Sequence, residues 1–379
     1  MSKNRDPIYL DHNATTPVLP EVVDAMLPYL REHFGNPSSN HVYGQRTRDA
    51  VAAARQQVAK LLGCRSEEIF FVSGGTEANN LAIRGAAAAR PERRHIVTSV
   101  IEHPATEMPC RFLESRGYSI VRVGVDGHGM VLDAAMEAAP GPDTALVSVM
   151  HANSETGTIQ PIRVMADAAH AAGALVHTDA AQSTGKIPFT VDELGIDLLS
   201  VVGHKMYAPK GIGALYVREG IELAPQLLGG GHEQGLRPGT ENVPYIVGLG
   251  KACEIASRDV LAEAERIAGL RDRLWELLKA EIPDLQLNGH PELRLPNTLN
   301  VRFPGVSGNA ILANAPRIAA STGSACHAED ESASAVIRAM GHSEEEAIGS
   351  VRLTLGRLTR PADIEASARA LKRAWLATR

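Results

Sequence analysis

Two short apolar runs that end in polar residues constrain the fold of this chain more than any other feature of its sequence. One run covers residues 175–182 and the other covers residues 198–205. Short apolar runs of this kind are typical of buried strands in a parallel sheet, and open α/β sheets bind their ligands at the carboxyl ends of such strands. The pattern therefore predicts a parallel sheet with Asp179 and Lys205 at its ligand-binding edge.

Similar runs alternate with helical patterns through the first two-thirds of the chain. Further strands are expected at 69–72, 95–100, 119–123 and 145–150, and helices at 49–62, 78–89 and 166–172. Gly63 follows the first of these helices and is a typical stop signal. This alternation favours the α/β class with a mainly parallel sheet.

The alternation ends near residue 251. A long helical pattern from about 252 to 280 comes next, followed by strand patterns at 297–303 and 350–355. No linker rich in proline, glycine or serine separates the two regions, so we expect one continuous helix to join them. The second region is predicted to be a smaller α+β domain.

The expected domain boundary falls within this helix. The large domain is expected to span 15–255, and the small domain to combine 1–14 with 256–379. Within the small domain, Ser343 and Glu346 have the spacing of a capping box, which predicts the start of a helix.

Composition argues against several classes of function. The chain has 379 residues and a net charge of −6, so it lacks the basic surface of a protein that binds nucleic acid directly. No apolar run resembles a signal peptide or a membrane span, and a cytoplasmic protein is the expectation. The four cysteines are widely scattered, which predicts neither a disulfide framework nor a metal site.

Asp179 and Lys205 are the two kinds of group that pyridoxal phosphate (PLP) needs. A lysine forms a Schiff base with this cofactor, and an acid keeps the pyridine nitrogen protonated so that the ring can withdraw electrons. Either residue alone would be interpreted as an ordinary surface charge at a strand end. The hypothesis therefore depends on the surrounding motifs.

Three other segments follow predicted strands at the same edge. The turn at 73–77 precedes a helix and offers main-chain N–H groups and a hydroxyl to a phosphate, although such turns are also common for steric reasons. His103 could stack on a flat cofactor or relay protons. Asn153 lies in a similar loop, and for both side chains a structural role is the alternative.

Three later segments carry further candidate groups. Arg237 and Thr240 belong to a glycine-rich stretch, 229–240, that is either functional or a flexible surface loop. Arg352 interrupts an apolar strand, where a guanidinium suits a substrate carboxylate or a buried ion pair. Cys326 has small, polar and acidic neighbours, which is the setting of an exposed and movable thiol.

Together these segments resemble the PLP-dependent cysteine desulfurases and selenocysteine lyases of the class V aminotransferase fold. The resemblance runs nearly from end to end, from 9–17 to 352–357. The motifs that carry it are Ser73-Gly74-Gly75-Thr76-Glu77, Glu102-His103, Asp179-Ala180-Ala181-Gln182, Gly203-His204-Lys205, Arg237-Pro238-Gly239-Thr240 and Gly323-Ser324-Ala325-Cys326.

The resemblance implies a fold and a set of cofactor contacts. The fold is the PLP-dependent transferase fold type I, with a mostly parallel seven-stranded sheet in the large domain and a smaller α+β domain. Lys205 would bind the cofactor covalently, Asp179 would contact its pyridine nitrogen, and Gln182 would contact its ring hydroxyl. His103 would stack on the ring and assist proton transfer.

The phosphate and the substrate have their own implied partners. Gly75, Thr76 and His204 would hold the phosphate, and Thr240 would reach it from the other subunit of a homodimer. Arg352 and Asn153 would bind the substrate carboxylate, with Asn153 also close to the cofactor.

The reaction implied by the resemblance is conversion of L-cysteine to L-alanine. Cys326 would attack the substrate sulfur and carry it as a persulfide to an acceptor protein. A movable loop suits that delivery step.

Some positions depart from the pattern of the desulfurases that serve iron–sulfur assembly. Val202 stands where a serine is usual and would remove a hydrogen bond to the phosphate; Ser154 and Pro104 also differ. The segments 202–205, 325–327, 177–182 and 237–242 look closer to the selenocysteine lyases, so L-selenocysteine is the alternative substrate. A binding platform for sulfur-trafficking partners and an aminotransferase acting on another amino acid are weaker alternatives.

Overall fold

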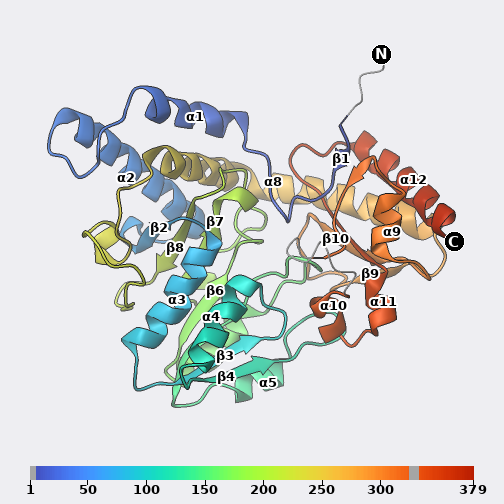
Figure 1. The fold of residues 1–379 in the computed structure, drawn as a ribbon, viewed down its shortest axis with the longest axis horizontal. Helices are drawn as coiled ribbons and strands as arrows, with labels where there is room; N and C mark the ends of the chain where they lie inside the picture. Colours follow the sequence, from blue (N-terminus) through green and yellow to red (C-terminus); the bar gives the residue numbers. More distant parts are fainter. Residues whose placement is uncertain (1–5, 324–332) are drawn as a thin grey trace.

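A seven-stranded sheet lies at the centre of the larger part of the molecule (Figure 1). The computed structural model describes residues 6–323 and 333–379. The strand order is β2-β8-β7-β6-β5-β3-β4, and only β8 runs antiparallel to its neighbours. The strands are β2 (Ile69–Val72), β3 (His95–Ser99), β4 (Ser119–Val123), β5 (Thr144–Ser148), β6 (Leu175–Asp179), β7 (Leu198–Val202) and β8 (Gly213–Val217). The predicted mostly parallel seven-stranded sheet is confirmed.

Helices cover both faces of this sheet because successive side chains of a strand point to opposite sides. One face packs on α3 (Gly75–Ala89) and α4 (Pro104–Glu114). The other packs on α2 (Val42–Leu62) and α6 (Ile162–Ala171), with α1 (Pro20–Arg31) nearby. Neighbouring residues of one strand illustrate the division, since Phe70 belongs to the first core and Phe71 to the second.

A smaller region contains an antiparallel sheet with its own apolar core. Its strands are β9 (Gln286–Asn288), β10 (Thr298–Arg302) and β12 (Ser350–Thr354), with β10 in the centre. The N-terminal β1 (Ile8–Tyr9) pairs with β11 (Ile318–Ala319) beside this sheet. The main helix of the region is α12 (Pro361–Thr378), and its Trp375 lies in the core with Leu10.

The remaining elements are short. They are α5 (Asp133–Ala138), α7 (Val191–Leu194), α9 (Gly308–Ala313), α10 (Ala335–Ala339), α11 (Glu344–Ile348) and the 3₁₀ turns η1 (Ser66–Glu68), η2 (Gly203–Lys205) and η3 (Glu233–Gly235). The capping box expected at Ser343 and Glu346 is confirmed at the start of α11. Within the described residues, no helix is both long and apolar enough to cross a bilayer.

One continuous helix, α8 (Val243–Glu281), joins the two regions, as the sequence predicted (Figure 1). It has 39 residues and begins earlier than the expected residue 252. Its first half contributes Cys253 to the core beneath the seven-stranded sheet, and its second half contributes Leu274 to the core of the smaller region.

The helix starts also differ from the predicted ones in three other places, and one of them is α6, which begins at Ile162 rather than at 166. α2 begins at Val42 rather than at 49, because His41 caps it through Nδ1, which accepts from the N–H of Gly44 at 3.3 Å. α3 begins directly at Gly75, so the predicted turn at 73–77 is mostly the first turn of the helix. Gly63 does end α2, in the left-handed conformation with φ of 69°.

Candidate active site

A cavity of about 260 Å³ lies at the carboxyl edge of the central sheet. Eight of the residues singled out from the sequence line it: Gly75, Thr76, His103, Asp179, Gln182, His204, Lys205 and Arg352. The edge forms because β6 and β7 are parallel neighbours, with Asp179 opposite Ser200 in their register. Seven of these residues come from the large sheet region, and Arg352 comes from β12 of the smaller one.

Asp179 ends β6 and is held by two hydrogen bonds. Nδ2 of Asn79 donates to its Oδ2 at 2.7 Å, and the N–H of Ala181 donates to its Oδ1 at 2.9 Å. Asn79 lies on α3, and its side chain also donates to Oγ1 of Thr106 on α4. The acid is therefore oriented by two helices that cover the sheet.

Lys205 lies in η2, one turn after the end of β7. Its amine donates to the main-chain carbonyls of Asn13 and Ala14, with the second contact at 2.8 Å. These carbonyls belong to the N-terminal segment that follows β1. The lysine thus reaches across the cavity to a segment that the sequence analysis had not connected with it.

The N-terminal end of α3 forms a tight cradle. A Cβ built on Gly75 would lie 2.6 Å from Cγ2 of Val202, so glycine is required while Val202 keeps its place. The N–H groups at the start of a helix are unsatisfied donors and suit an anion. Thr76 and His204 line the cavity beside this helix end.

Both histidines at the cavity are held in a neutral form. Burial, opposed by Asp179 and aided by the charge of Lys205, lowers the pKa of His103. Its Nδ1 accepts from the N–H of Ala105 at 3.0 Å, which leaves the ring proton on Nε2. Burial, with the neighbouring charges led by Lys205, lowers the pKa of His204 to about 4.

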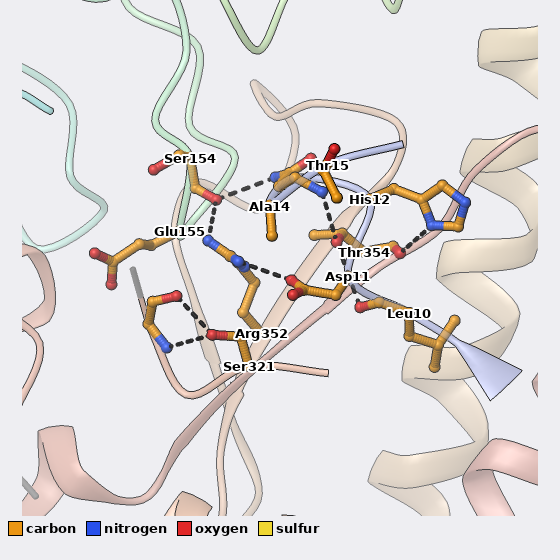
Figure 2. Close-up of polar contacts among 12 residues, drawn as sticks. Leu10, Asp11, His12, Ala14, Thr15, Ser154, Glu155, Ser321, Arg352 and Thr354 are labelled. Carbon is orange, nitrogen blue, oxygen red and sulfur yellow. Dashed lines mark hydrogen bonds and ion pairs between the residues drawn. The ribbon is translucent and has the colours of Figure 1, made fainter. Parts of the chain in front are cut away.

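Arg352 is buried, with 2% of its side chain exposed, and it points into a set of acceptors (Figure 2). Its Nη2 lies 2.8 Å from Oδ1 of Asp11, and its Nη1 donates to the main-chain oxygen of Ser154 at 3.2 Å. Its Nε is buried without a hydrogen-bond partner among the described residues. The guanidinium therefore keeps donors for a further acceptor in the cavity.

Asn153 and Thr240 are not among the described residues that line this cavity. Asn153 is buried, and its Oδ1 accepts from the N–H groups of Glu155 and Thr156, so its side chain orders its own loop. Thr240 is exposed. Cys326 lies outside the described residues.

Several residues that shape the cavity were missed by the sequence analysis. Asn13 and Ala14 line it, while Asp11 and Asn79 stand behind it as partners of charged side chains. Asn79 lies 100 residues from Asp179 along the chain, so no local pattern connects the two. The polar run at 11–16 was a visible signal, but only the fold places it against Lys205.

A buried carboxyl group lies next to His103. Oε1 of Glu102 accepts from Oγ of Ser99 at 2.5 Å and from the N–H of Met150 at 3.0 Å, whereas Oε2 is buried without a partner among the described residues. Burial raises the pKa of Glu102 to about 8. Its side chain ties the end of β3 to the loop after β5.

The family model for class V aminotransferases matches residues 8–366 of this chain. The chain belongs to the class V aminotransferase family. A cysteine desulfurase of Trichormus azollae is 48% identical over 360 residues, which cover 94% of this chain and 90% of that protein. A protein of Dictyoglomus turgidum named cysteine desulfurase IscS is 46% identical over 369 residues, covering 97% and 94%.

Solved structures agree with this class V aminotransferase over nearly its full length. A NifS-like protein superposes with a TM-score of 0.91 at 35% identity, covering 97% of this chain and 98% of that one. A protein described as SspA in complex with cysteine has a TM-score of 0.83 at 38% identity, covering 92% and 98%.

The class V aminotransferase family depends on PLP, and the cavity fits this cofactor. Asp179 and Lys205 supply an acid and an amine at the same edge, and the Gly75 cradle at the start of α3 supplies main-chain donors for a phosphate. Among the residues in 6–323 and 333–379, no group of three or more His, Cys, Asp or Glu side chains is arranged to hold a metal ion.

Proposed function

We propose that this class V aminotransferase is a cysteine desulfurase that converts L-cysteine to L-alanine and carries the sulfur as a persulfide on Cys326. The observation that carries the proposal is that one cavity brings Asp179 and Lys205 together with a buried guanidinium, Arg352. Relatives that cover more than nine-tenths of the chain and are named cysteine desulfurases support the choice of reaction.

The chain's own residues would hold PLP in a defined orientation. Lys205 would bind it covalently, and Asp179 would face its pyridine nitrogen, held there by Asn79. Gly75, Thr76 and His204 would hold the phosphate. When bound, the cofactor supplies an electron-withdrawing ring conjugated with the α-carbon of the substrate.

Gln182 and His103 would contact the ring itself. Both line the cavity, and the ring proton of His103 is on Nε2. A neutral imidazole in this position can take up a proton from the substrate and return it at another stage. The low pKa of His103 keeps it neutral for the first of these steps.

Arg352 would bind the substrate carboxylate. Its buried Nε has no partner among the described residues, and a guanidinium can bind a carboxylate through two parallel hydrogen bonds. Asn153 would assist from the neighbouring loop by holding Ser154 and Glu155 in place, because Glu155 donates its N–H to Oδ1 of Asn153.

The thiolate of Cys326 would attack the sulfur of the bound substrate. A sulfur–sulfur bond forms, and the carbon–sulfur bond of the substrate breaks with its electron pair left on the carbon skeleton. That skeleton takes up protons and leaves as alanine, while Cys326 keeps the extra sulfur atom. A sulfur-acceptor protein would then remove it.

A homodimer is part of the proposal. Thr240 is exposed and away from the cavity of its own chain, which suits a phosphate contact in the second subunit. Arg55 on α2 binds Glu233 through two contacts of 2.7 and 2.8 Å, and this anchors the glycine-rich stretch beside α2. Two large apolar side chains near these segments are exposed, Phe34 between α1 and α2 at 80% and Leu228 just before the glycine-rich stretch at 91%.

The division into domains and the location are further parts of the proposal. The two halves of α8 pack in two separate apolar cores. These cores support a large domain of 15–255 and a small domain formed by 1–14 and 256–379. Cys64, Cys110 and Cys253 are free thiols, which supports a cytoplasmic location.

L-selenocysteine is a second candidate substrate because of Val202. This residue lines the cavity and packs against Gly75, where a serine is usual in desulfurases of iron–sulfur assembly. The valine removes a hydroxyl donor from the phosphate end of the site.

The decisive experiment compares turnover of L-cysteine and L-selenocysteine by the wild-type enzyme and Cys326→Ala. Loss of cysteine turnover in the variant, with alanine as the product of the wild type, is the expected result. Cys253→Ala is the matched control, because that thiol is fully buried in a core. Cysteine turnover that survives Cys326→Ala would overturn the persulfide step, and a large preference for L-selenocysteine would favour the second substrate.

A further inference from the structure

A second lysine, Lys186, lies directly behind the cavity that holds Lys205. Its amine donates to Oε1 of Gln182 at 2.8 Å and to Oδ1 of Asn13 at 3.0 Å. Gln182 and Asn13 both line the cavity, whereas Lys186 stands behind them. Neither the family's motifs nor the proposed reaction gives this lysine a role.

The local backbone places Lys186 beside Gln182. Residues 181–186 form a series of turns after β6, in which the N–H of Lys186 donates to the oxygen of Ser183 at 3.0 Å. Residues four apart in such a helical turn share one side. The two side chains are therefore neighbours because of the chain's local geometry.

The amide of Gln182 is fixed in one of its two orientations. A main-chain carbonyl can only accept, and the carbonyl of Asn13 takes a hydrogen bond of 3.0 Å from Nε2 of Gln182. On the other side, the amine of Lys186 donates to the amide oxygen. The Nε2 group keeps a second N–H in this orientation.

The second acceptor of Lys186 is fixed just as firmly. Nδ2 of Asn13 donates to the main-chain oxygen of Ser154 at 3.1 Å, which turns the oxygen of that amide toward Lys186. Nδ2 of Asn297 also donates to Oδ1 of Asn13, at 2.9 Å. Lys186 thus faces two oxygens whose positions do not depend on it alone.

The charge of Lys186 suits this arrangement. Burial, with the positive charges of Lys205 and Arg352, lowers its pKa well below the usual value. Both the neutral amine and the ammonium form have at least two N–H groups, enough for the two oxygens that Lys186 meets.

We propose that Lys186 is a positioning residue that holds the Gln182 amide so that its NH₂ group, rather than its oxygen, serves the ring oxygen of the cofactor. The inference rests on the proposed cofactor site in this cavity, but not on which amino acid the enzyme consumes. A donor on the ring oxygen reduces the negative charge there and makes the neighbouring lysine-bound nitrogen easier to deprotonate.

The test is an absorbance titration of the cofactor-loaded protein against pH, without substrate. In Lys186→Met, the pKa of the lysine-bound chromophore is expected to rise by about one unit, the equivalent of one lost hydrogen bond. Gln182→Leu is expected to raise it by a similar amount. The double variant should match Gln182→Leu alone, because the lysine acts through the amide. Lys210→Met is the control for loss of one nearby positive charge, since Lys210 is exposed but influences His204.

Each outcome decides the proposal. Additive shifts in the double variant, or an equal shift in Lys210→Met, would show a direct charge effect and overturn it. An unchanged titration in Lys186→Met would overturn it as well.

If that variant does not fold, Lys186→Gln keeps an N–H donor and should titrate like the wild type, whereas a shift like that of Gln182→Leu would contradict the proposal. A protein that desulfurates no cysteine but shows these shifts would refute the proposed reaction and leave this inference standing.

Discussion

Nη2 of Arg352 lies 2.8 Å from Oδ1 of Asp11, although the two residues are 341 positions apart in the sequence. The contact joins the segment after β1 to β12 (Figure 2), and both of these regions contribute residues to the lining of the cavity, Asn13 and Arg352 among them. Asp11 offsets the charge of a guanidinium that is almost fully buried. Because an unpaired buried charge is costly, this pair keeps Arg352 in place before any substrate carboxylate arrives.

Replacing Arg352 by lysine tests the proposed carboxylate contact. An ammonium cannot form the two parallel hydrogen bonds of a guanidinium, so Arg352→Lys should raise KM for L-cysteine roughly 10- to 100-fold, with a smaller effect on kcat. Arg302→Lys, on the adjacent strand β10, is the matched control. Steady-state kinetics measure both, and an unchanged KM in Arg352→Lys would remove this residue from the substrate site.

Lys205 is the expected covalent anchor of the cofactor. Purified wild-type protein should be yellow, and Lys205→Ala should lose the absorbance of the lysine-bound cofactor because no other amine lines the cavity in the described part of the chain. Lys210→Ala should stay yellow. Borohydride reduction followed by peptide mass spectrometry locates the linkage, and a cofactor still attached to a lysine of Lys205→Ala would contradict this assignment.

The buried carboxyl of Glu102 should make stability depend on pH. Burial raises the pKa of Glu102 from 4.5 to about 8. Between these two pH values the carboxyl group is protonated in the folded protein but ionised in the unfolded chain. The free energy of unfolding should therefore fall as pH rises from about 5 to 8, by up to roughly 1.4 kcal/mol per unit from this group. Glu102→Gln imitates the protonated form and should be the more stable protein at pH 8 but not at pH 5.

Urea unfolding at the two pH values checks this expectation. Glu344→Gln changes an exposed acid of α11 and serves as the control. If the free energies of unfolding of Glu102→Gln and the wild type differ by the same amount at pH 5 and pH 8, the pKa of Glu102 is not raised in the folded protein.

The cradle at the start of α3 has no room for a side chain at Gly75. In Gly75→Ala the new methyl group would meet Val202 at 2.6 Å, so cofactor affinity should fall by about tenfold or more. Val202→Ala removes the clash and should restore much of the affinity in the double variant, while Val202→Ala alone is the control. Titration of the cofactor-free proteins with PLP measures this, and normal affinity in Gly75→Ala would rule out the close fit.

The sequence predicted the parts of this site that depend on a single strand and the loop after it. Asp179 and Lys205 were predicted because each follows an apolar run, and neighbouring parallel strands bring such ends together. The joining helix and six of the seven strands were also predicted from local patterns, whereas the seven-stranded sheet as a whole was implied by the family resemblance and β8 was not recognised in the sequence. Local periodicity carries this information because it reports which face of an element is buried.

The rest depends on contacts between distant segments. Asp11 and Asn79 have ordinary local settings, and only the fold places them beside Arg352 and Asp179. Lys186 has the sequence of a surface lysine in a turn, yet its amine is buried against two amides. No local pattern distinguishes a charged side chain that packs behind a site from one that faces water.

The long helix α8 has a consequence for how this chain can vary. Its first half is packed in one core and its second half in the other, with no break between Ala256 and Ile267. One residue inserted there would turn everything downstream by about 100° and shift it by about 1.5 Å. Arg352 would then be moved out of the cavity. None of the described residues that line the cavity belongs to α8, yet the length of this helix sets how the two halves of the site are oriented relative to each other.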